Sequence, residues 1–342
     1  MKQKITRRAF GRRALGLGAI GYFVSNLPSQ DKASAALAPR KRLPNPFVEN
    51  GKPIVIVVHG KDFTSMLKKG MEILGGFDRF GKKNAVHIKP NFVSPNPYPE
   101  TTDGNSILAT IEMLKKDGFS DITVAEWGSL GMGADHAFTE GFKYYGLDRK
   151  AESGGFKIKD LINEESVKVA DKRWIAMPDV GIRKSVYEIP MIINMPTLKQ
   201  HSQVQFSCAL KNNMGHVDKQ TRNNMHREGM RFASENANTR YRMSQMALAE
   251  IAAAVNPELT IIDARLGMGR AHHLNMGGVS IKPERIIISG DALAADLVAA
   301  DVLAECYQGF QVEMIQTHFQ HAGKLGFGAK TIDDIVMKEA SV

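Results

Sequence analysis

The stretch AVHIKPNFVSPNPYPETTDGNSILATIEMLKKDGFSDITVA, residues 85–125, decides the fold. It opens with a β-branched apolar run at 85–88, continues into a helix-like segment at 105–116, and ends in a second β-branched run at 122–125. Two apolar strands joined by a helix are typical of parallel pairing, because parallel neighbours need a long crossover connection. This stretch therefore predicts one repeat of an α/β fold.

The same alternation extends over most of the chain. Further strand-like runs lie at 54–58, 191–194, 260–263 and 285–289, and further helix-like segments at 63–74, 239–255 and 291–305. Nearly continuous apolar strands that alternate with helices predict a three-layer α/β fold, with helices on both faces of a largely parallel sheet.

Three segments predict the domain boundaries and a mobile region. Residues 36–52 are rich in proline and are predicted to be an extended linker, so that residues 53–342 form a single domain. The polar run at 218–240 is too long for an ordinary connection, which predicts either a mobile lid or disorder.

The first 35 residues have the pattern of a twin-arginine export signal. Arg7 and Arg8 precede an apolar run at 14–24, which would rise only about 16 Å as a helix and so cannot cross a bilayer. Ala33-Ser34-Ala35 is a small-x-small cleavage site, and 36–38 is a second candidate. An uncleaved anchor is the alternative. We expect the twin-arginine translocase as a partner, a periplasmic or extracytoplasmic location, and no stable membrane span in the mature form.

The basic charge of the chain is concentrated near its beginning. The formal charge is +9, but seven basic residues against one acidic residue fall within 1–35, and Arg40, Lys41 and Arg42 follow directly. The remainder is close to neutral. A nucleic-acid-binding domain would carry its own basic face, so we expect no nucleic acid as a partner.

Three polar segments follow predicted strands and are candidate parts of a site. Lys89 follows the strand at 85–88, where it is expected to emerge beside the helix start near Thr101 and Thr102; this is a typical anion-binding arrangement. The second segment holds Lys199, His201, Lys211 and Asn212, and the third holds Asp263 and Asp291. For Asp291, a simple helix cap is the favoured interpretation.

Cysteine and histidine content limits the cofactors. The two cysteines, Cys208 and Cys306, cannot ligate an iron–sulfur cluster alone, and whether they form a disulfide stays open. Residues 201–276 hold five of the ten histidines, and residues 191–276 hold nine of the seventeen methionines. Such side chains suit copper, zinc or another divalent ion. A metal or another cofactor, its identity unknown, is therefore one interpretation, and core packing by methionine is the other.

Three blocks in order resemble the signature blocks of the domain-of-unknown-function 362 family: KPNFVSPNPYPETTD, INMPTLKQHSQVQFSCALKNNMGH and NPELTIIDARLGMG with SGDALAADLVAADVL. The resemblance covers about residues 54–305. Many relatives carry a ferredoxin-like cysteine cluster, which this chain lacks. The resemblance singles out Lys89, Asn91, Thr102, Lys199, His201, Lys211, Asn212, Gly215, Asp263, Asp291 and Asp296.

Two functions remain open at this point. The first is an enzyme that binds a small anionic molecule in a cleft at the strand ends. In it Lys199, His201 and Asp263 are catalytic, and the ligand-binding residues are Lys89, Asn91, Thr102, Lys211, Asn212 and Asp291. The alternative is a non-catalytic ligand- or metal-binding accessory protein of the cell envelope. The sequence leaves open whether the protein is an enzyme.

The export signal gives the first testable prediction. Replacing Arg7 and Arg8 together with lysine keeps the charge and should block export, and the wild-type mature chain should begin near Ala36. Fractionation of cells, followed by N-terminal sequencing, measures both. Normal envelope localisation of the double-lysine variant would contradict the prediction.

Overall fold

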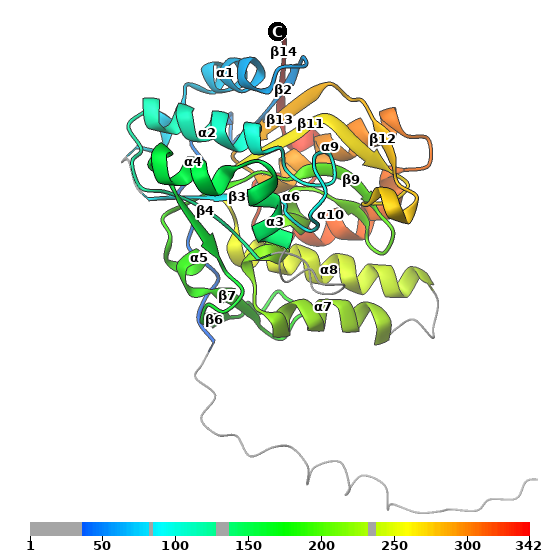
Figure 1. Ribbon diagram of the computed structural model, residues 1–342. Coiled ribbons are helices and arrows are strands. Elements are labelled where there is room, and N and C mark those ends of the chain that lie inside the picture. The colour runs from blue at the N-terminus through cyan, green and yellow to red at the C-terminus, as the bar shows by residue number, and fades with distance from the viewer. Residues whose placement is uncertain (1–35, 82–84, 128–136, 232–236) are drawn as a thin grey trace, which may run out of the picture. The chain divides into compact units, whose positions relative to one another are not determined.

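A computed structural model of the protein describes residues 36–81, 85–127, 137–231 and 237–342 (Figure 1). Residues Ala36–Val342 form one compact unit. The predicted leader, residues 1–35, lies outside the described residues. The following account concerns the unit from Ala36 onward.

A mixed, mostly parallel sheet forms the centre of this unit. In the described part of the chain it has twelve strands, and the main path runs in the order β1-β2-β13-β11-β8-β3-β4-β5. Its strands are β1 (Val48–Glu49), β2 (Lys52–His59), β3 (Val86–Lys89), β4 (Ile122–Glu126), β5 (Lys157–Asp160), β8 (Met191–Asn194), β9 (Thr197–His201), β10 (Gln205–Ser207), β11 (Leu259–Gly269), β12 (Val279–Ile281), β13 (Arg285–Ser289) and β14 (Val336–Ser341). A separate antiparallel pair consists of β6 (Ser166–Val169) and β7 (Val180–Arg183).

Helices pack on both faces of the sheet, and the sheet lies between two apolar cores. One core joins α1 (Phe63–Leu74) and α2 (Gly104–Lys116) to side chains such as Ile56 and Ile88. The other joins α8 (Ala237–Val255) and α9 (Ala292–Cys306) to side chains such as Val57 and Ile192. Successive residues of a strand point to opposite faces, so each buried strand contributes to both cores. The three-layer α/β prediction is confirmed.

The remaining helices are shorter or lie at the margins of the sheet. They are α3 (Ala137–Tyr144), α4 (Leu147–Gly154), α5 (Lys184–Glu188), α6 (Ala209–Asn212), α7 (Lys219–Arg231) and α10 (Gln316–Ala322). In Figure 1, α7 and α8 lie side by side, and α6 packs against α8 and α9.

Strand register brings together the residues that follow the central strands. Lys89 of β3 pairs with Asn194 of β8, and Asn194 pairs in turn with Thr260 of β11. The chain then resumes as β9, which runs parallel to the later half of β11. Lys89, the last residue of β3, and Lys199, within β9, therefore belong to the same parallel region of the sheet.

Strand β13 runs antiparallel to its two neighbours, β11 and β2. This direction separates Asp291 from the residues at the ends of the parallel strands. The chain that leaves β13 heads toward the amino ends of these neighbours. Asp291 follows β13 and caps α9 by accepting a hydrogen bond from Ala294 N at 2.8 Å and another from Gly328 N. The cap interpretation of Asp291 matches this geometry, and its inclusion among the ligand-binding residues stays a prediction.

Residues 36–52 are extended, as expected, but they pack as part of the fold and are not a free linker. Phe47 is buried in the first core. Arg40 is 4% exposed, and its guanidinium donates to Glu258 Oε2 at 3.0 Å and to main-chain oxygens of Ile189 and Val255. The boundary predicted at residue 53 is therefore too late, because a basic residue read as linker charge forms a buried ion pair.

The segment 218–240 is also different from the prediction. Helix α7 occupies Lys219–Arg231 and α8 begins at Ala237, so most of the segment is helical. Residues 232–236 lie outside the described residues. The interpretation as a long loop is wrong, because helix formation satisfies the backbone of a polar stretch as well as solvent does. Movement of the segment stays a prediction.

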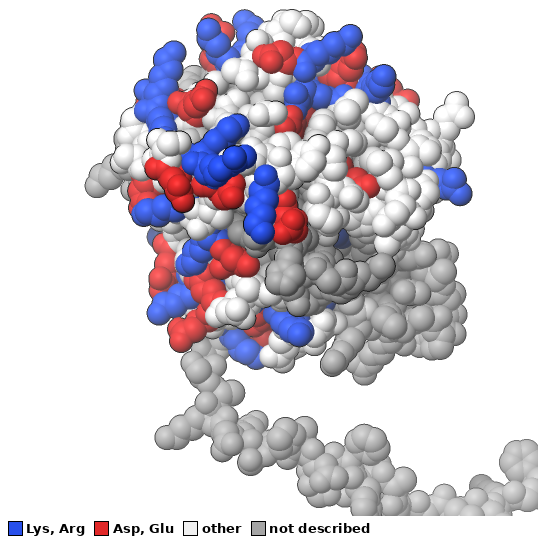
Figure 2. Space-filling model, in the orientation of Figure 1, with Lys and Arg blue, Asp and Glu red and all other residues white. Residues whose placement is uncertain are grey.

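Two surface properties bear on partners. In the described ranges, no helix is long and apolar enough to cross a membrane. On the face in Figure 2, lysine and arginine side chains are interspersed with aspartate and glutamate.

The Arg40–Glu258 pair gives a second prediction. Replacing Arg40 with alanine leaves the Glu258 carboxylate buried without its cation, which should lower the free energy of unfolding by about 3–5 kcal/mol. Replacing the exposed neighbour Lys41 with alanine is the matched control and should change it by less than about 0.5 kcal/mol. Urea denaturation measures both. Equal stability of the two variants would show that residues 36–42 do not belong to the folded unit.

Candidate functional site

A buried ion pair joins the carboxyl ends of two neighbouring parallel strands. Lys89 is the last residue of β3, and Glu126 is the last residue of β4. Lys89 Nζ donates to Glu126 Oε2 at 2.5 Å and to Pro90 O at 2.7 Å, and the two side chains are 1% and 2% exposed. The expectation that the Lys89 ammonium emerges into a cleft is therefore wrong, because the adjacent strand ends in a carboxylate that neutralises it.

Burial acts on both members of this pair. It lowers the pKa of Lys89 and raises the pKa of Glu126, while their mutual attraction opposes both shifts. The desolvation cost of such a pair is comparable to the attraction within it. An ion pair in this position is thus held by its surroundings, which supply further hydrogen bonds.

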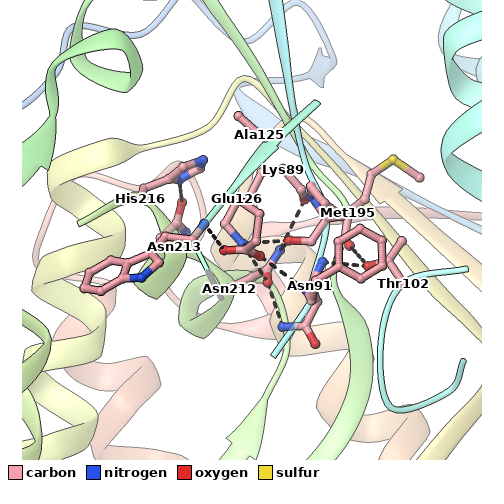
Figure 3. A network of polar contacts seen from close by, with 12 residues as sticks. Lys89, Asn91, Thr102, Ala125, Glu126, Met195, Asn212, Asn213 and His216 are labelled. Carbon is pink, nitrogen blue, oxygen red and sulfur yellow. Dashed lines mark hydrogen bonds and ion pairs between the residues drawn. The ribbon is translucent and has the colours of Figure 1, made fainter. Parts of the chain in front are cut away.

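Three asparagines supply these bonds (Figure 3). Asn212 Oδ1 accepts from Lys89 Nζ at 3.3 Å and from Asn91 Nδ2 at 2.9 Å. Its Nδ2 donates to Asn194 Oδ1 at 2.7 Å. Asn91, Asn194 and Asn212 come from three different parts of the chain, so the network fixes the loop after β3, the end of β8 and the helix α6 against one another.

Gly215 lets the backbone approach the ion pair closely. A Cβ at this position would lie 1.7 Å from Glu126 Oε1 and 2.6 Å from Lys89 Cε. Both distances are far inside van der Waals contact, so any side chain here would displace the pair. This is the physical reason for a glycine at this position.

Lys199 is tied to the same network from the other side. Its Nζ donates to Asn91 Oδ1 at 2.6 Å and to Glu100 O at 2.7 Å, and the residue is 1% exposed. Asn91 therefore stands between Lys199 and the Asn212 carboxamide that contacts Lys89. Burial, followed by the nearby charge of Lys211, lowers the pKa of Lys199 to about 7.

Thr102 has a different role from the predicted cap. Its hydroxyl accepts from Asn91 N at 2.7 Å and donates to Met195 O at 2.7 Å, whereas Asp103 caps α2 by accepting from Asn105 N. Thr102 thus positions Asn91 and the chain that leaves β8.

Histidine rings form a stacked group beside Lys199. The His201 and His272 rings lie parallel with centroids 3.9 Å apart, and the His273 centroid is 4.3 Å from that of His272. His201 Nδ1 accepts from the backbone N–H groups of Gln203 and Val204 at 3.1 and 3.3 Å, so the proton of the neutral ring is on Nε2. His273 Nδ1 lies 2.8 Å from Glu100 Oε2. Sequence reasoning had grouped these histidines as metal ligands without placing them together.

The rings are kept neutral by their surroundings. Burial and then the charge of Lys211 lower the pKa of His272 to about 2 and that of His201 well below its ordinary value. The pKa of His226, on α7, is lowered to about 4 for the same two reasons. Neutral imidazoles can donate and accept hydrogen bonds without adding charge.

The positive charge of Lys211 contributes to the lowered pKa values of Lys199, His201, His226 and His272. Lys211 lies in α6, is half-buried, and contacts no hydrogen-bond acceptor or carboxylate within the described ranges. Burial, together with the charges of Arg222 and Lys89, lowers the pKa of Lys211 to about 8. Lys89 and Lys199 are each neutralised or hydrogen-bonded, whereas Lys211 is not.

Asp296 holds α6 in place. This residue of α9 accepts from Ala209 N at 2.6 Å and from Leu210 N at 2.9 Å, the first two residues of α6. Burial raises the pKa of Asp296 to about 7. The helix that carries Lys211 and Asn212 is thus anchored at its start by a buried carboxyl group.

Asp263 belongs to another cluster. Its oxygens accept from Tyr98 Oη at 2.8 Å, Ser106 Oγ at 2.9 Å and Arg265 Nη2 at 2.7 Å. Arg265 also binds Asp103 at 2.8 Å. These contacts engage both carboxylate oxygens of Asp263 and none comes from Lys199 or His201, so the predicted catalytic orientation by Asp263 is not seen.

A second histidine pair lies behind the ion pair. His87 Nε2 is 3.2 Å from His216 Nε2 and 3.2 Å from Ala125 O, and burial lowers the pKa of His87 to about 3. His216 Nδ1 lies 3.3 Å from Asn213 Oδ1. The two rings fill the space under Glu126 as neutral, hydrogen-bonded groups.

The cofactor expectations can be compared with these positions. Among the residues described, no group of three or more His, Cys, Asp or Glu side chains is arranged to hold a metal ion. Cys208 and Cys306 are both free thiols, so they do not form a disulfide with each other in this structure.

Sequence reasoning missed Glu126 and Glu100 as contributors to the site, and it considered His272 only as one of several histidines that could bind a metal. Glu126 could have been found, because it is the residue after the predicted strand 122–125 and parallel neighbours end at one edge. Glu100 acts partly through its backbone carbonyl, which has no sequence signal. His272 lies near His201 only because β9 pairs with β11.

The ion pair gives a third prediction. Replacing Lys89 with methionine should lower the free energy of unfolding by about 3–5 kcal/mol, because the Glu126 carboxylate is left buried without its partner. Adding Glu126→Gln should recover part of this loss. Lys157→Met, in the exposed pair with Asp121, is the control and should cost less than about 1 kcal/mol. Chemical denaturation of the four proteins measures the coupling. A Lys89→Met cost as small as that of the control would contradict the buried pair.

The chain is similar to known proteins in sequence and in fold. A thylakoid-associated protein of Synechocystis is 28% identical over 247 residues, which cover 69% of this chain and 68% of that protein. The lactate racemase apoprotein from Thermoanaerobacterium thermosaccharolyticum superposes with a TM-score of 0.43 at 17% identity. The match covers 67% of this chain and 52% of that structure's chain.

The family model described as "Domain of unknown function (DUF362)" matches residues 86–301. These residues include β3, β4, β8, β9, α6 and the first part of α9, and therefore the polar network around Lys89 and Lys211. More than half of the chain is matched, and the chain belongs to the domain-of-unknown-function 362 family.

Proposed function

We propose that the protein binds a small anionic molecule, a carboxylate or a phosphate, at a site centred on Lys211, and that it does so outside the cytoplasm after twin-arginine export. The observation that carries the proposal is the Lys211 ammonium, which forms no ion pair and no hydrogen bond with the described residues. Desolvated cations are normally paired, and one that is not is most simply balanced by a ligand.

The neighbours of Lys211 support an anion rather than a cation. Lys199, Arg222 and Lys89 all lie within electrostatic reach of Lys211, and Glu126 is the negative group that acts on its pKa. Glu126 is already bound to Lys89. A bound carboxylate or phosphate would therefore meet attraction from more than one cation.

The histidines add directional contacts. Neutral His201 carries its proton on Nε2, and His272 Nδ1 is buried with no hydrogen-bond partner in the described part of the chain. Such groups fix the orientation of a ligand. The rings stay neutral near pH 7, so acid–base work in this site would fall to Lys199 and Lys211, whose pKa values of about 7 and about 8 lie in the working range.

Catalysis is the proposed extension of binding. Two amines that titrate near neutrality beside an anion site favour an enzyme over the accessory binding protein, which needs only hydrogen-bond donors.

The fourth prediction concerns Lys211→Met, which removes the charge and keeps most of the side-chain length. Phosphate affinity should fall by about ten- to 100-fold, because a charge-assisted hydrogen bond contributes about 1.5–3 kcal/mol. Isothermal titration calorimetry with inorganic phosphate measures this. Lys61→Met is the matched control, since Lys61 is 81% exposed and lies outside the site. Equal affinity in both variants would contradict the proposal.

The same variant should be more stable than the wild type at pH 7 without phosphate. The folded pKa of Lys211, about 8, is below its ordinary value of 10.5, so folding disfavours the charged form. Between pH 8 and 10.5 the unfolded chain binds more protons at Lys211 than the folded chain does. The free energy of unfolding of the wild type should therefore rise with pH over this range. The Tm advantage of Lys211→Met should therefore shrink between pH 8 and 10.5. A lower Tm for the variant at pH 7 would indicate a packing role instead.

A further inference from the structure

Lys199 and Lys211, whose pKa values are lowered to about 7 and about 8, differ in their contacts and in their exposure. Lys199 Nζ is held by Asn91 Oδ1 and Glu100 O and is almost fully buried. Lys211 Nζ has no acceptor among the residues described and is half-buried. The nitrogen of Lys211 is therefore the one that a ligand can reach without breaking existing hydrogen bonds.

The surroundings of Lys211 favour a neutral amine. An ammonium that is crowded by other cations and removed from water loses its proton more readily, which is the usual way in which proteins activate a lysine as a nucleophile. The charged and titratable groups in electrostatic reach of Lys211 are Lys89 of β3, Glu126 of β4, Lys199 and His201 of β9, Arg222 and His226 of α7, and His272 and His273 after β11.

Orienting groups accompany the amine. His272 Nδ1 is a buried ring nitrogen without a hydrogen-bond partner in the described chain, and the ring is stacked on His201 at 3.9 Å. A polar nitrogen left in this state costs free energy unless a ligand contacts it. The same small region thus offers a free amine, an unsatisfied imidazole nitrogen and a net positive charge.

We propose that Lys211 forms an imine with the carbonyl carbon of a small carbonyl compound that also bears an anionic group, such as a 2-oxo acid. The inference rests on the proposed anion site, which would hold the carboxylate while the amine attacks. It adds a covalent step and a substrate class to that site.

The step needs no oxidant or reductant. The Lys211 ammonium first gives up one proton, and its nitrogen lone pair then forms a bond to the carbonyl carbon. The carbonyl oxygen gains protons and leaves as water, so that a protonated imine and water replace the ammonium and the carbonyl. Of the three ammonium protons, two leave in the water molecule and one is on the imine nitrogen of the product, so reactants and products carry the same net charge.

Reductive trapping of the full-length protein tests the proposal. Glyoxylate is the anionic probe, acetaldehyde is the neutral one, and sodium cyanoborohydride converts either imine to a stable secondary amine. Mass spectrometry of the intact protein and of its peptides should show one dominant glyoxylate adduct, at Lys211. Labelling with acetaldehyde should be at least tenfold slower at this residue, and inorganic phosphate should slow the glyoxylate reaction.

The controls separate Lys211 from other lysines. Lys211→Met should lose the dominant adduct, while Lys61→Met should keep it. Trapping in the wild type should become half-maximal near pH 8, where Lys211 loses its proton, rather than near 10.5 as for an exposed lysine. Peptide mapping of the wild type alone still decides the question if a variant fails to fold.

Two outcomes would overturn the imine. Adducts spread over exposed lysines, or a glyoxylate adduct unchanged in Lys211→Met, would show that Lys211 is not the reactive amine. If phosphate still binds the wild type and binding depends on Lys211, the anion site stands and only the covalent step is wrong. If phosphate binding is also absent, the proposed function itself is wrong.

Discussion

The buried ion pair between Lys89 and Glu126 is the interaction on which the site depends. It exists because two parallel strands end side by side, one in a lysine and the other in a glutamate, and because the sheet excludes water from both. Such a pair is tolerated only when its remaining hydrogen-bonding capacity is used. Asn212 and the backbone around Asn91 form these remaining hydrogen bonds. Gly215, which has no side chain, leaves space for the ion pair. The loop after β3 and the helix α6 are therefore positioned by one electrostatic requirement.

That requirement also explains why Lys211 stands apart. Asn212 must face the ion pair, and Asp296 anchors the start of α6. Lys211 lies between these two fixed points and has no carboxylate of its own in the described structure. Each neighbouring positive charge is either neutralised or hydrogen-bonded, which concentrates the uncompensated charge at one amine. Holding an unpaired cation in this way lowers the stability of the fold, and in return the site attracts an anion in the proposed function.

Sequence reasoning could predict the fold because apolar periodicity is local. The segments 63–74 and 285–289 coincide with α1 and β13, and the strand at 191–194 coincides with β8. The site was harder, because its contacts depend on strand order and direction. Asp291 was grouped with Lys89 because the strand before it was expected to belong to the largely parallel sheet, and β13 is antiparallel to its neighbours. Lys89 was expected to emerge at the end of its strand in an anion site, because Glu126 was not recognised as the end of the next strand. Lys199 and Lys211 were found because polar residues after buried strands are a local signal.

The central claim is that Lys211 marks an anion site, and anomalous diffraction from crystals soaked in bromide tests it most directly. Bromide scatters anomalously and replaces small anions at positive sites. The account predicts a strong bromide peak within hydrogen-bonding distance of Lys211 Nζ in the wild type, and its loss in Lys211→Met. Peaks confined to exposed lysines, with the Lys211 ammonium paired to a protein carboxylate, would contradict the account.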